Sequence, residues 1–362
     1  MNARRILVLI LIIVLTVSLI GCAQLGPKAI EASRTDYNIA MHRTEEEQSL
    51  LNLVRLRYGD RPYFLEATAL NTQFSISPSV DARATLNPDS ADIVNLGGRL
   101  AFEEKPTISY SPLTGEAFVR QVLSRISIET LLLLDASGWK TDRVLRLGVE
   151  KINSLDNAAR ASGPTPSVGS DVAPFLRAIA LLSNFQDQNE LRFARKTANE
   201  KTEYVALFAD SATHTAEFQE LASLLDLDPM LGEYKLAANT VKTAKDTISL
   251  STRSFMGVLY FLSQGVVVPE EHVSAGLVAL TKNPSGSLYD WEQVTSGLLA
   301  VRSSKQQESL TNVSVQYRGH WFFIDDTDIQ SKSTFALLGQ LYALQSKSNE
   351  SAAPVLTLPL GN

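Results

Sequence analysis

The chain has 362 residues, of which 44% are hydrophobic and 20% are charged, proportions typical of a folded globular protein rather than a disordered one. Its formal charge is -6, with 39 acidic against 33 basic residues, so we expect no nucleic-acid partner, which would require clustered lysine and arginine. The single cysteine, Cys22, excludes an intramolecular disulfide and, if it is modified, cysteine-based catalysis.

The first 21 residues have the layout of a secretory signal peptide. Arg4 and Arg5 precede an almost wholly apolar run over residues 6–20, and the small Gly21 stands before Cys22. An apolar run of about fifteen residues is short for a bilayer span, which needs about 20. We therefore expect residues 1–21 to be removed on export.

The segment Leu19-Ile20-Gly21-Cys22 resembles the lipobox of bacterial lipoproteins. This resemblance implies cleavage after Gly21, acylation of the Cys22 sulfur and acylation of the new amino group. Several acyl chains hold a protein stably on a membrane, whereas a single chain does so only marginally. Ala23 follows where an aspartate would resemble an inner-membrane retention signal, so we expect a lipid anchor on the periplasmic face of the outer membrane. Residues 22–30 form a short tether.

Helical and strand patterns alternate along the first half of the mature chain. Residues 29–58 are expected to be helical, with a possible restart at Thr44, because Thr44-Glu45-Glu46-Glu47 has the spacing of a capping box. Apolar and polar residues alternate over residues 70–77, which predicts a strand that ends at Pro78. Further strands are expected at residues 99–104, 107–111 and 144–149, and further helices at residues 118–126 and 128–136.

The second half repeats this mixture after a loop rich in glycine and proline at residues 157–170. The expected helices begin at Asp171, near Phe218, at Phe255 and near Phe335. The expected strands are residues 190–195, 203–209, 233–238, 247–251, 313–317 and 321–324.

These patterns predict an α+β fold of small mixed sheets and packed helices. Thr107 to Ser111 and Thr247 to Ser251 are similar in sequence, and each precedes an apolar helix, which raises the possibility of two similar lobes. The expected division is a first lobe at residues 31–156, a linker at 157–170, a second lobe at 171–350 and an extended tail at 351–362.

Residues 51–65, 107–118 and 317–341 look like those of a family of bacterial envelope lipoproteins. The likeness spans nearly the whole mature chain. It implies location in the cell envelope and transfers no functional residue to this sequence.

The sequence contains no motif that specifies a catalytic or metal site. The four histidines are more than about forty residues apart, so folding would have to assemble any site for zinc. Asp325 to Asp328 do not fit a calcium loop, and these acids are better explained as caps of the following helix. Ser137 and Lys140 match the spacing of a serine–lysine pair, but the accompanying motifs of such enzymes are missing. We expect no catalytic residue, metal or cofactor.

Arg55, Arg57 and Arg61 form the densest basic group. Guanidinium groups can bind carboxylate or phosphate through two parallel hydrogen bonds. These arginines are therefore a candidate site for an anion or a partner, although pairing with nearby acids would also explain them.

The sequence favours a lipid-anchored accessory protein of the envelope that binds another protein and has no catalytic activity. Two alternatives stay open. One is an envelope hydrolase whose site is assembled from dispersed residues, and the other is a small-ligand binding protein with a cleft between two lobes.

Overall fold

The computed structural model describes residues 25–85, 93–164, 166, 169, 171–198, 201–238 and 244–345. The predicted signal, Gly21, Cys22 and the predicted tail lie outside these residues. The chain divides into two compact units: the main unit, Met1–Pro62 with Arg120–Asn362, and the ribbon unit, Tyr63–Val119. The fold is α+β, as the sequence predicts, with sheets of six, three and two strands in the described part of the chain.

A six-stranded sheet lies at the centre of the main unit, in the order β4-β3-β8-β7-β6-β5. Neighbouring strands are antiparallel except for β7 and β8, which are parallel. The strands are β3 (Val149–Ile152), β4 (Leu155–Asp156), β5 (Leu191–Ala198), β6 (Lys201–Phe208), β7 (Glu233–Ala238) and β8 (Thr247–Thr252).

Seven helical segments of the described chain accompany this sheet. They are α4 (Ile128–Ala136), α5 (Thr141–Gly148), the 3-10 helix η2 (Ala159–Ser162), α6 (Ala173–Asp187), α7 (Asp210–Thr213), α8 (Ala216–Leu224) and α9 (Phe255–Ser263). Of these, α4, α5, α6 and η2 contact the strands of the sheet directly. Hydroxyl side chains cap three of them, because Ser127, Thr215 and Ser254 each accept a hydrogen bond from a backbone N–H of the first turn. The aromatic centre of the core is formed by Phe185, Phe208, Phe218 and Tyr234, which pack edge-to-face or tilted.

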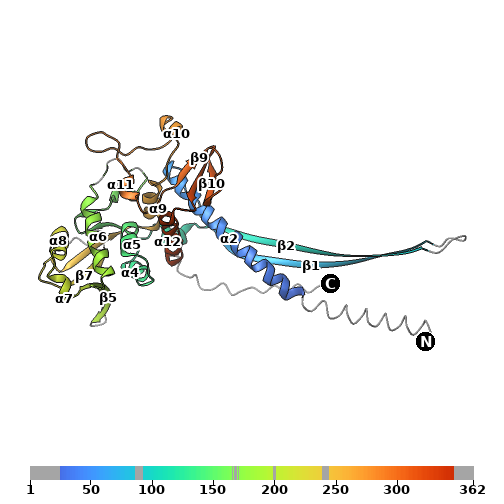
Figure 1. Ribbon diagram of the computed structural model, residues 1–362, viewed down its shortest axis with the longest axis horizontal. Coiled ribbons are helices and arrows are strands. Elements are labelled where there is room, and N and C mark those ends of the chain that lie inside the picture. Colours follow the sequence, from blue (N-terminus) through green and yellow to red (C-terminus); the bar gives the residue numbers. More distant parts are fainter. Residues whose placement is uncertain are drawn as a thin grey trace. The chain divides into compact units, whose positions relative to one another are not determined.

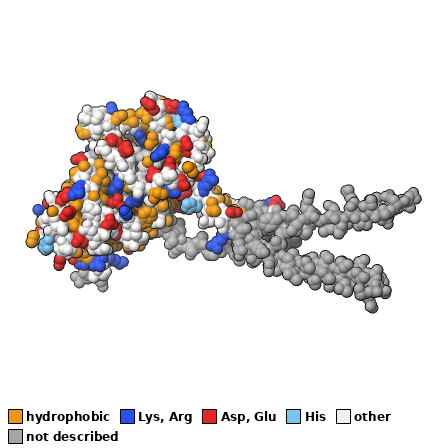
Figure 2. Space-filling view, viewed as in Figure 1, with side chains coloured by type: hydrophobic (Ala, Val, Ile, Leu, Met, Phe, Trp, Pro, Cys, Tyr) orange, Lys and Arg blue, Asp and Glu red, His pale blue; other side chains and the backbone are white. Residues whose placement is uncertain are grey.

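The remainder of the main unit is built on a three-stranded antiparallel sheet in the order β10-β11-β9. Its elements are α2 (Leu25–Arg57), α10 (Glu270–Ser274), α11 (Glu292–Thr295), β9 (Arg302–Ser304), β10 (Thr311–Tyr317), β11 (His320–Asp325) and α12 (Ile329–Gln345). Helix α2 packs against both α9 and β10. Gly59, with a φ of 74°, ends α2 in the left-handed conformation that glycine adopts readily. On the face drawn in Figure 2, acidic and basic side chains of the main unit are interspersed.

The ribbon unit consists mainly of β1 (Leu65–Thr85) and β2 (Ile93–Pro112), which form a long antiparallel pair (Figure 1). The short helix α3 (Gly115–Phe118) follows, and the π-helical turn η1 (Val119–Leu123) leads into the main unit. At the base of the pair the Leu113 N–H donates to the Phe64 carbonyl at 3.0 Å.

Three predicted elements differ from the structure. Helix α2 continues through Thr44, because the acids that follow Thr44 pair with basic side chains one turn earlier in the helix. Arg43 donates to Glu47 at 2.9 Å, and His42 lies 3.6 Å from Glu46. Strand β1 continues through Pro78, which faces Leu100, because each strand of a two-stranded pair is an edge that tolerates a missing N–H.

Residues 144–149, predicted as a strand, lie mostly in helix α5, which is followed directly by β3. Val144, Leu145, Leu147 and Gly148 are all buried, so this short segment is covered on more than one face. Buried segments of this length show the same apolar pattern in a helix and in a strand.

The units also differ from the two lobes that the sequence suggested. Strand β3, from the expected first lobe, pairs with β8, from the expected second lobe. Residues of the expected linker belong to the core, since Ala158 and Ala161 are buried and the Asn157 amide donates to the Val149 carbonyl at 2.7 Å. The two similar segments lie in unlike strands, β2 of the ribbon and β8 of the central sheet.

Candidate functional site

The three arginines singled out by the sequence have separate surroundings. Arg57 Nη1 donates to the Ala279 carbonyl at 3.0 Å, and burial lowers the pKa of Arg57. Arg55 Nη1 lies 3.4 Å from the Asn52 side-chain oxygen, and Arg61 is exposed beyond the end of α2. Asp60 pairs instead with Arg318 at 2.9 Å. Anion or partner binding by Arg55, Arg57 and Arg61 stays a prediction.

The other motifs considered from the sequence have structural explanations. The Ser137 hydroxyl donates to the Leu133 carbonyl at 2.7 Å at the end of α4. The capping interpretation of the acidic run is confirmed, since Asp328 accepts a hydrogen bond from the Ser331 N–H at 3.0 Å in the first turn of α12.

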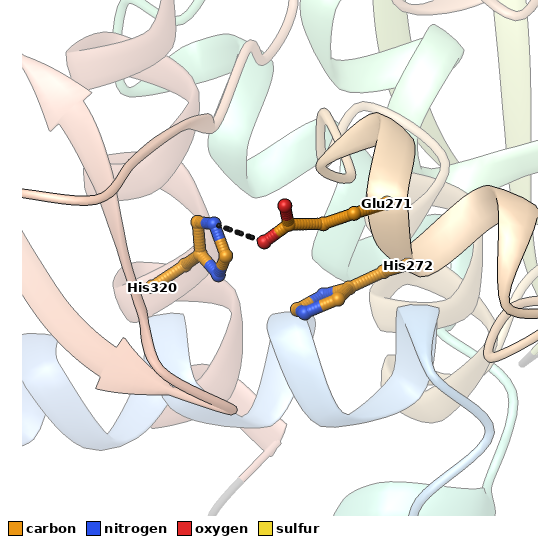
Figure 3. A group of neighbouring side chains, drawn as sticks. All are labelled: Glu271, His272 and His320. Carbon is orange, nitrogen blue, oxygen red and sulfur yellow. Dashed lines mark ion pairs between the residues drawn. The ribbon is translucent and has the colours of Figure 1, made fainter.

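Two histidines far apart in the sequence come together in the main unit. His272 lies on α10 and His320 at the start of β11, and their ring centroids are 4.9 Å apart. Glu271, beside His272 on α10, places a carboxylate oxygen 3.1 Å from His320 Nε2. Figure 3 shows the two imidazoles and the carboxylate turned toward one another, and we call these three residues the histidine cluster.

The histidine cluster is embedded on one side and open on the other. His320 is 6% exposed, His272 is half-buried and the Glu271 side chain is 52% exposed. Glu271 and His320 also line an open cavity of about 530 Å³, together with Pro269, Glu270, Ser274, Ser303, Ser304 and Lys305. A cavity of this size is within the range of small-ligand sites.

Tyr58, which directly follows α2, contacts the histidine cluster. The Tyr58 hydroxyl lies 2.6 Å from His272 Nδ1. Burial raises the pKa of Tyr58 to about 12, so the phenol is protonated at neutral pH. The Arg318 guanidinium lies 5.2 Å from the centre of the Tyr58 ring.

A carboxylate on the turn after α2 fixes this arrangement. Asp60 accepts hydrogen bonds from Tyr317 and Arg318, and the Tyr317 hydrogen bond is the largest cause that lowers the pKa of Asp60. The turn is thereby joined to the hairpin of β10 and β11, which carries His320 at the start of β11.

Two features of the histidine cluster bear on its chemistry. His320 Nδ1 is buried and has no hydrogen-bond partner among the described residues. Glu271, His272 and His320 are also the one group of described histidine, cysteine or acidic residues whose ligand atoms lie close enough, within 4.8 Å, to hold a metal ion. No local spacing connects residues 272 and 320, so the sequence alone does not indicate that these two histidines meet.

The ribbon provides a second candidate surface, defined by the register of its strands. From residue 69 onward, even-numbered positions of β1 face even-numbered positions of β2, as in Ile76 with Phe102 and Val80 with Gly98. Residues of the same parity in a strand share a face. The even positions are mainly apolar, with Thr72, Gly98 and Glu104 as exceptions. The apolar residues are Leu70, Phe74, Ile76, Pro78, Val80, Ala82, Ala84, Val94, Leu96, Leu100, Phe102, Pro106 and Ile108.

The odd positions of the same strands are mainly polar. Their polar residues are Asn71, Gln73, Ser75, Ser77, Ser79, Asp81, Arg83, Thr85, Asn95, Arg99, Glu103, Lys105, Thr107 and Ser109, and the exceptions are Ala69, Ile93, Gly97 and Ala101. By register and sequence the ribbon is therefore amphipathic, with an even face of mainly apolar positions and an odd face of mainly polar positions. Ile108, on the even face, is 38% exposed.

Comparison with known proteins identifies no relative: no family model, curated protein or solved structure matches the chain. Among the described helices, none combines the length and the apolar character that a membrane-spanning helix requires.

Proposed function

We propose that this chain is an interaction protein of the bacterial cell envelope, anchored through Cys22 to the periplasmic face of the outer membrane, and that the ribbon is its docking element. The observation that supports this proposal is the amphipathic register of β1 and β2. The anchor rests on the lipobox resemblance of Leu19-Ile20-Gly21-Cys22.

The ribbon is unusual as an independent structure. Strand β2 has 20 residues, which corresponds to a length of about 65 Å at about 3.4 Å per residue. A lone two-stranded hairpin is at best marginally stable in water, and a sheet normally gains its stability by burying an apolar face. The described residues place no third strand beside β1 or β2.

An apolar face of this extent favours a protein partner that covers it. Large exposed apolar patches on proteins mark sites of association, because burial stabilises the complex by about 25 cal/mol for each Å² of apolar surface. The odd face, with its serines and charges of both signs, suits contact with water. The partner is therefore expected to contact the even face and leave the odd face solvated.

Charge substitutions on the two faces of the ribbon test this proposal. Ile76→Glu and Leu100→Glu place a carboxylate on the even face, and their matched controls, Ser77→Glu and Ala101→Glu, place it one residue away on the odd face. In detergent extracts of the native host, the even-face variants are expected to migrate as a free chain and the controls as the larger complex. All four variants should remain in the membrane fraction, since Cys22 is unchanged.

Two results would contradict this proposal. Equal sizes for all four variants would show that the even face is not the docking surface. A face-dependent change in the size of the purified chain alone would identify the partner as a second copy rather than another protein. Analytical ultracentrifugation of the purified protein makes that distinction.

A further inference from the structure

We propose that Glu271, His272 and His320 form a binding site for a first-row divalent metal ion of borderline softness, of which Zn²⁺ is the representative. This inference concerns the main unit and does not depend on the proposed role of the ribbon.

The donor set fits this class of metal. Two imidazoles and one carboxylate make up known zinc sites that keep one position open, and imidazole also suits iron, copper and nickel. Calcium and magnesium prefer several oxygen ligands, and the histidine cluster offers oxygen only from Glu271. The ligand atoms lie within 4.8 Å of one another, and the Glu271 side chain is half-exposed.

His320 provides the observation that distinguishes this cluster from an ordinary ion pair. Its Nε2 faces the Glu271 carboxylate at 3.1 Å, an arrangement in which Nε2–H is the donor. In the neutral ring the other nitrogen, Nδ1, then carries a lone pair, and this atom is buried without a partner. A buried acceptor without a partner is unfavourable, and a metal ion would satisfy it.

His272 is prepared for the same role by Tyr58. The Tyr58 oxygen is 2.6 Å from His272 Nδ1, and when Nδ1–H donates to it, Nε2 is left with its lone pair. Tyr58 therefore acts as a positioning residue that holds the orientation of this ring. The open cavity beside Glu271 and His320 gives a metal ion a path from solvent.

Lys305 provides a further test, because its ammonium group would compete with a metal ion for the Glu271 carboxylate. Its ammonium lies 3.4 Å from Glu271 Oε2, and its side chain is 74% exposed. If Glu271 binds metal, Lys305→Ala removes a competing positive charge and should tighten binding several-fold. If the cluster is only a network of hydrogen bonds, this substitution changes no metal affinity.

The test is titration of the purified full chain with Zn²⁺ by calorimetry and with Co²⁺ by visible absorption, both at pH 7.5. One ion per chain is expected, with Co²⁺ bands that report nitrogen and oxygen ligands. His272→Ala, His320→Ala and Glu271→Gln should each weaken binding by about tenfold or more. Circular dichroism checks that each variant is folded. If the buried His320→Ala variant unfolds, His272→Ala still tests the proposal, because His272 is only half-buried.

The chain offers matched controls on its own surface. His42 lies 3.6 Å from Glu46 on α2 and is 70% exposed, and His214 is exposed at the end of α7. His42→Ala and His214→Ala should leave the affinity unchanged. The proposal is overturned if the wild-type chain binds no stoichiometric metal, or if His272→Ala and the two controls bind it equally.

Discussion

Arg253 is the largest side chain that the main unit encloses completely, with 1% of its surface exposed. Its guanidinium connects carbonyl groups from α5, β3 and the start of the expected linker: it donates to Arg146, Leu147, Val149 and Asn157. It also donates to the Ser162 hydroxyl at 3.0 Å and lies 4.1 Å from the centre of the Phe261 ring. Burial lowers the pKa of Arg253 to about 9, so the group is still charged at pH 7.

Replacing Arg253 by methionine should be strongly destabilising. The methionine fills much of the volume but removes the Arg253 donors from four carbonyl oxygens, of which only those of Arg146 and Val149 keep a hydrogen bond from the Asn157 amide. A buried carbonyl left without a donor costs about 1–3 kcal/mol. We expect the free energy of unfolding to fall by about 3 kcal/mol or more, a large part of the typical total of about 5–15 kcal/mol. Urea unfolding followed by circular dichroism measures this loss.

Arg302→Met is the control for Arg253→Met. Arg302 is 61% exposed and lies 3.5 Å from Asp325, so its loss should cost at most about 1 kcal/mol. Equal losses for the two variants would show that the enclosed network contributes nothing beyond a surface pair.

At the scale of elements, strong local patterns were sufficient for prediction. The hairpin of β5 and β6, the strands β7 and β8, helix α9 and the hairpin of β10 and β11 are confirmed. In each of these, periodicity and turn residues point to one structure. The ambiguous cases were decided by neighbours: ion pairs carry α2 through Thr44, and burial makes residues 144–148 a helix.

The histidine cluster could not be predicted either, because it too depends on contacts between residues distant in the sequence. His272 belongs to a five-residue helix and His320 to a strand that follows a tight turn at Arg318 and Gly319. Only the packing of α10 against β11 brings these two rings together. The amphipathic character of the ribbon was visible over residues 70–77, but its full length depended on the pairing across Pro78.

Two hydroxyl residues, one at the start of a helix and one within a helix, should respond differently to substitution. The Ser254 hydroxyl accepts a hydrogen bond from the Gly257 N–H at 3.1 Å and caps α9, so Ser254→Ala should cost about 1 kcal/mol. Thr44 lies within α2, where its hydroxyl donates to the Met41 carbonyl, and Thr44→Ala should be neutral or slightly stabilising because alanine favours a helix. Thermal unfolding of both variants provides the comparison, and a larger loss for Thr44→Ala would indicate that a helix does restart there.

At the scale of the whole molecule, the two units correspond to two separate proposals. The histidine cluster, its cavity and the enclosed Arg253 all belong to the main unit, whereas the amphipathic strands belong to the ribbon unit. The main unit also contains both multi-stranded sheets and the aromatic core. Its stability should therefore be independent of β1 and β2, and the activities assigned to the units should be separable.

Replacing residues 66–111 with a three-residue Gly-Asn-Gly turn tests this independence. Phe64 and Leu113 already meet at the base of the strands, so a short turn can join them without distorting the main unit. The shortened protein should unfold cooperatively with a Tm within about 4 °C of the full chain, the shift that corresponds to about 1 kcal/mol in a domain of this size. Calorimetry measures the Tm, and Co²⁺ absorption should be retained while the larger complex in host extracts is lost. A broad, non-cooperative transition would instead show that the core of the main unit requires the ribbon.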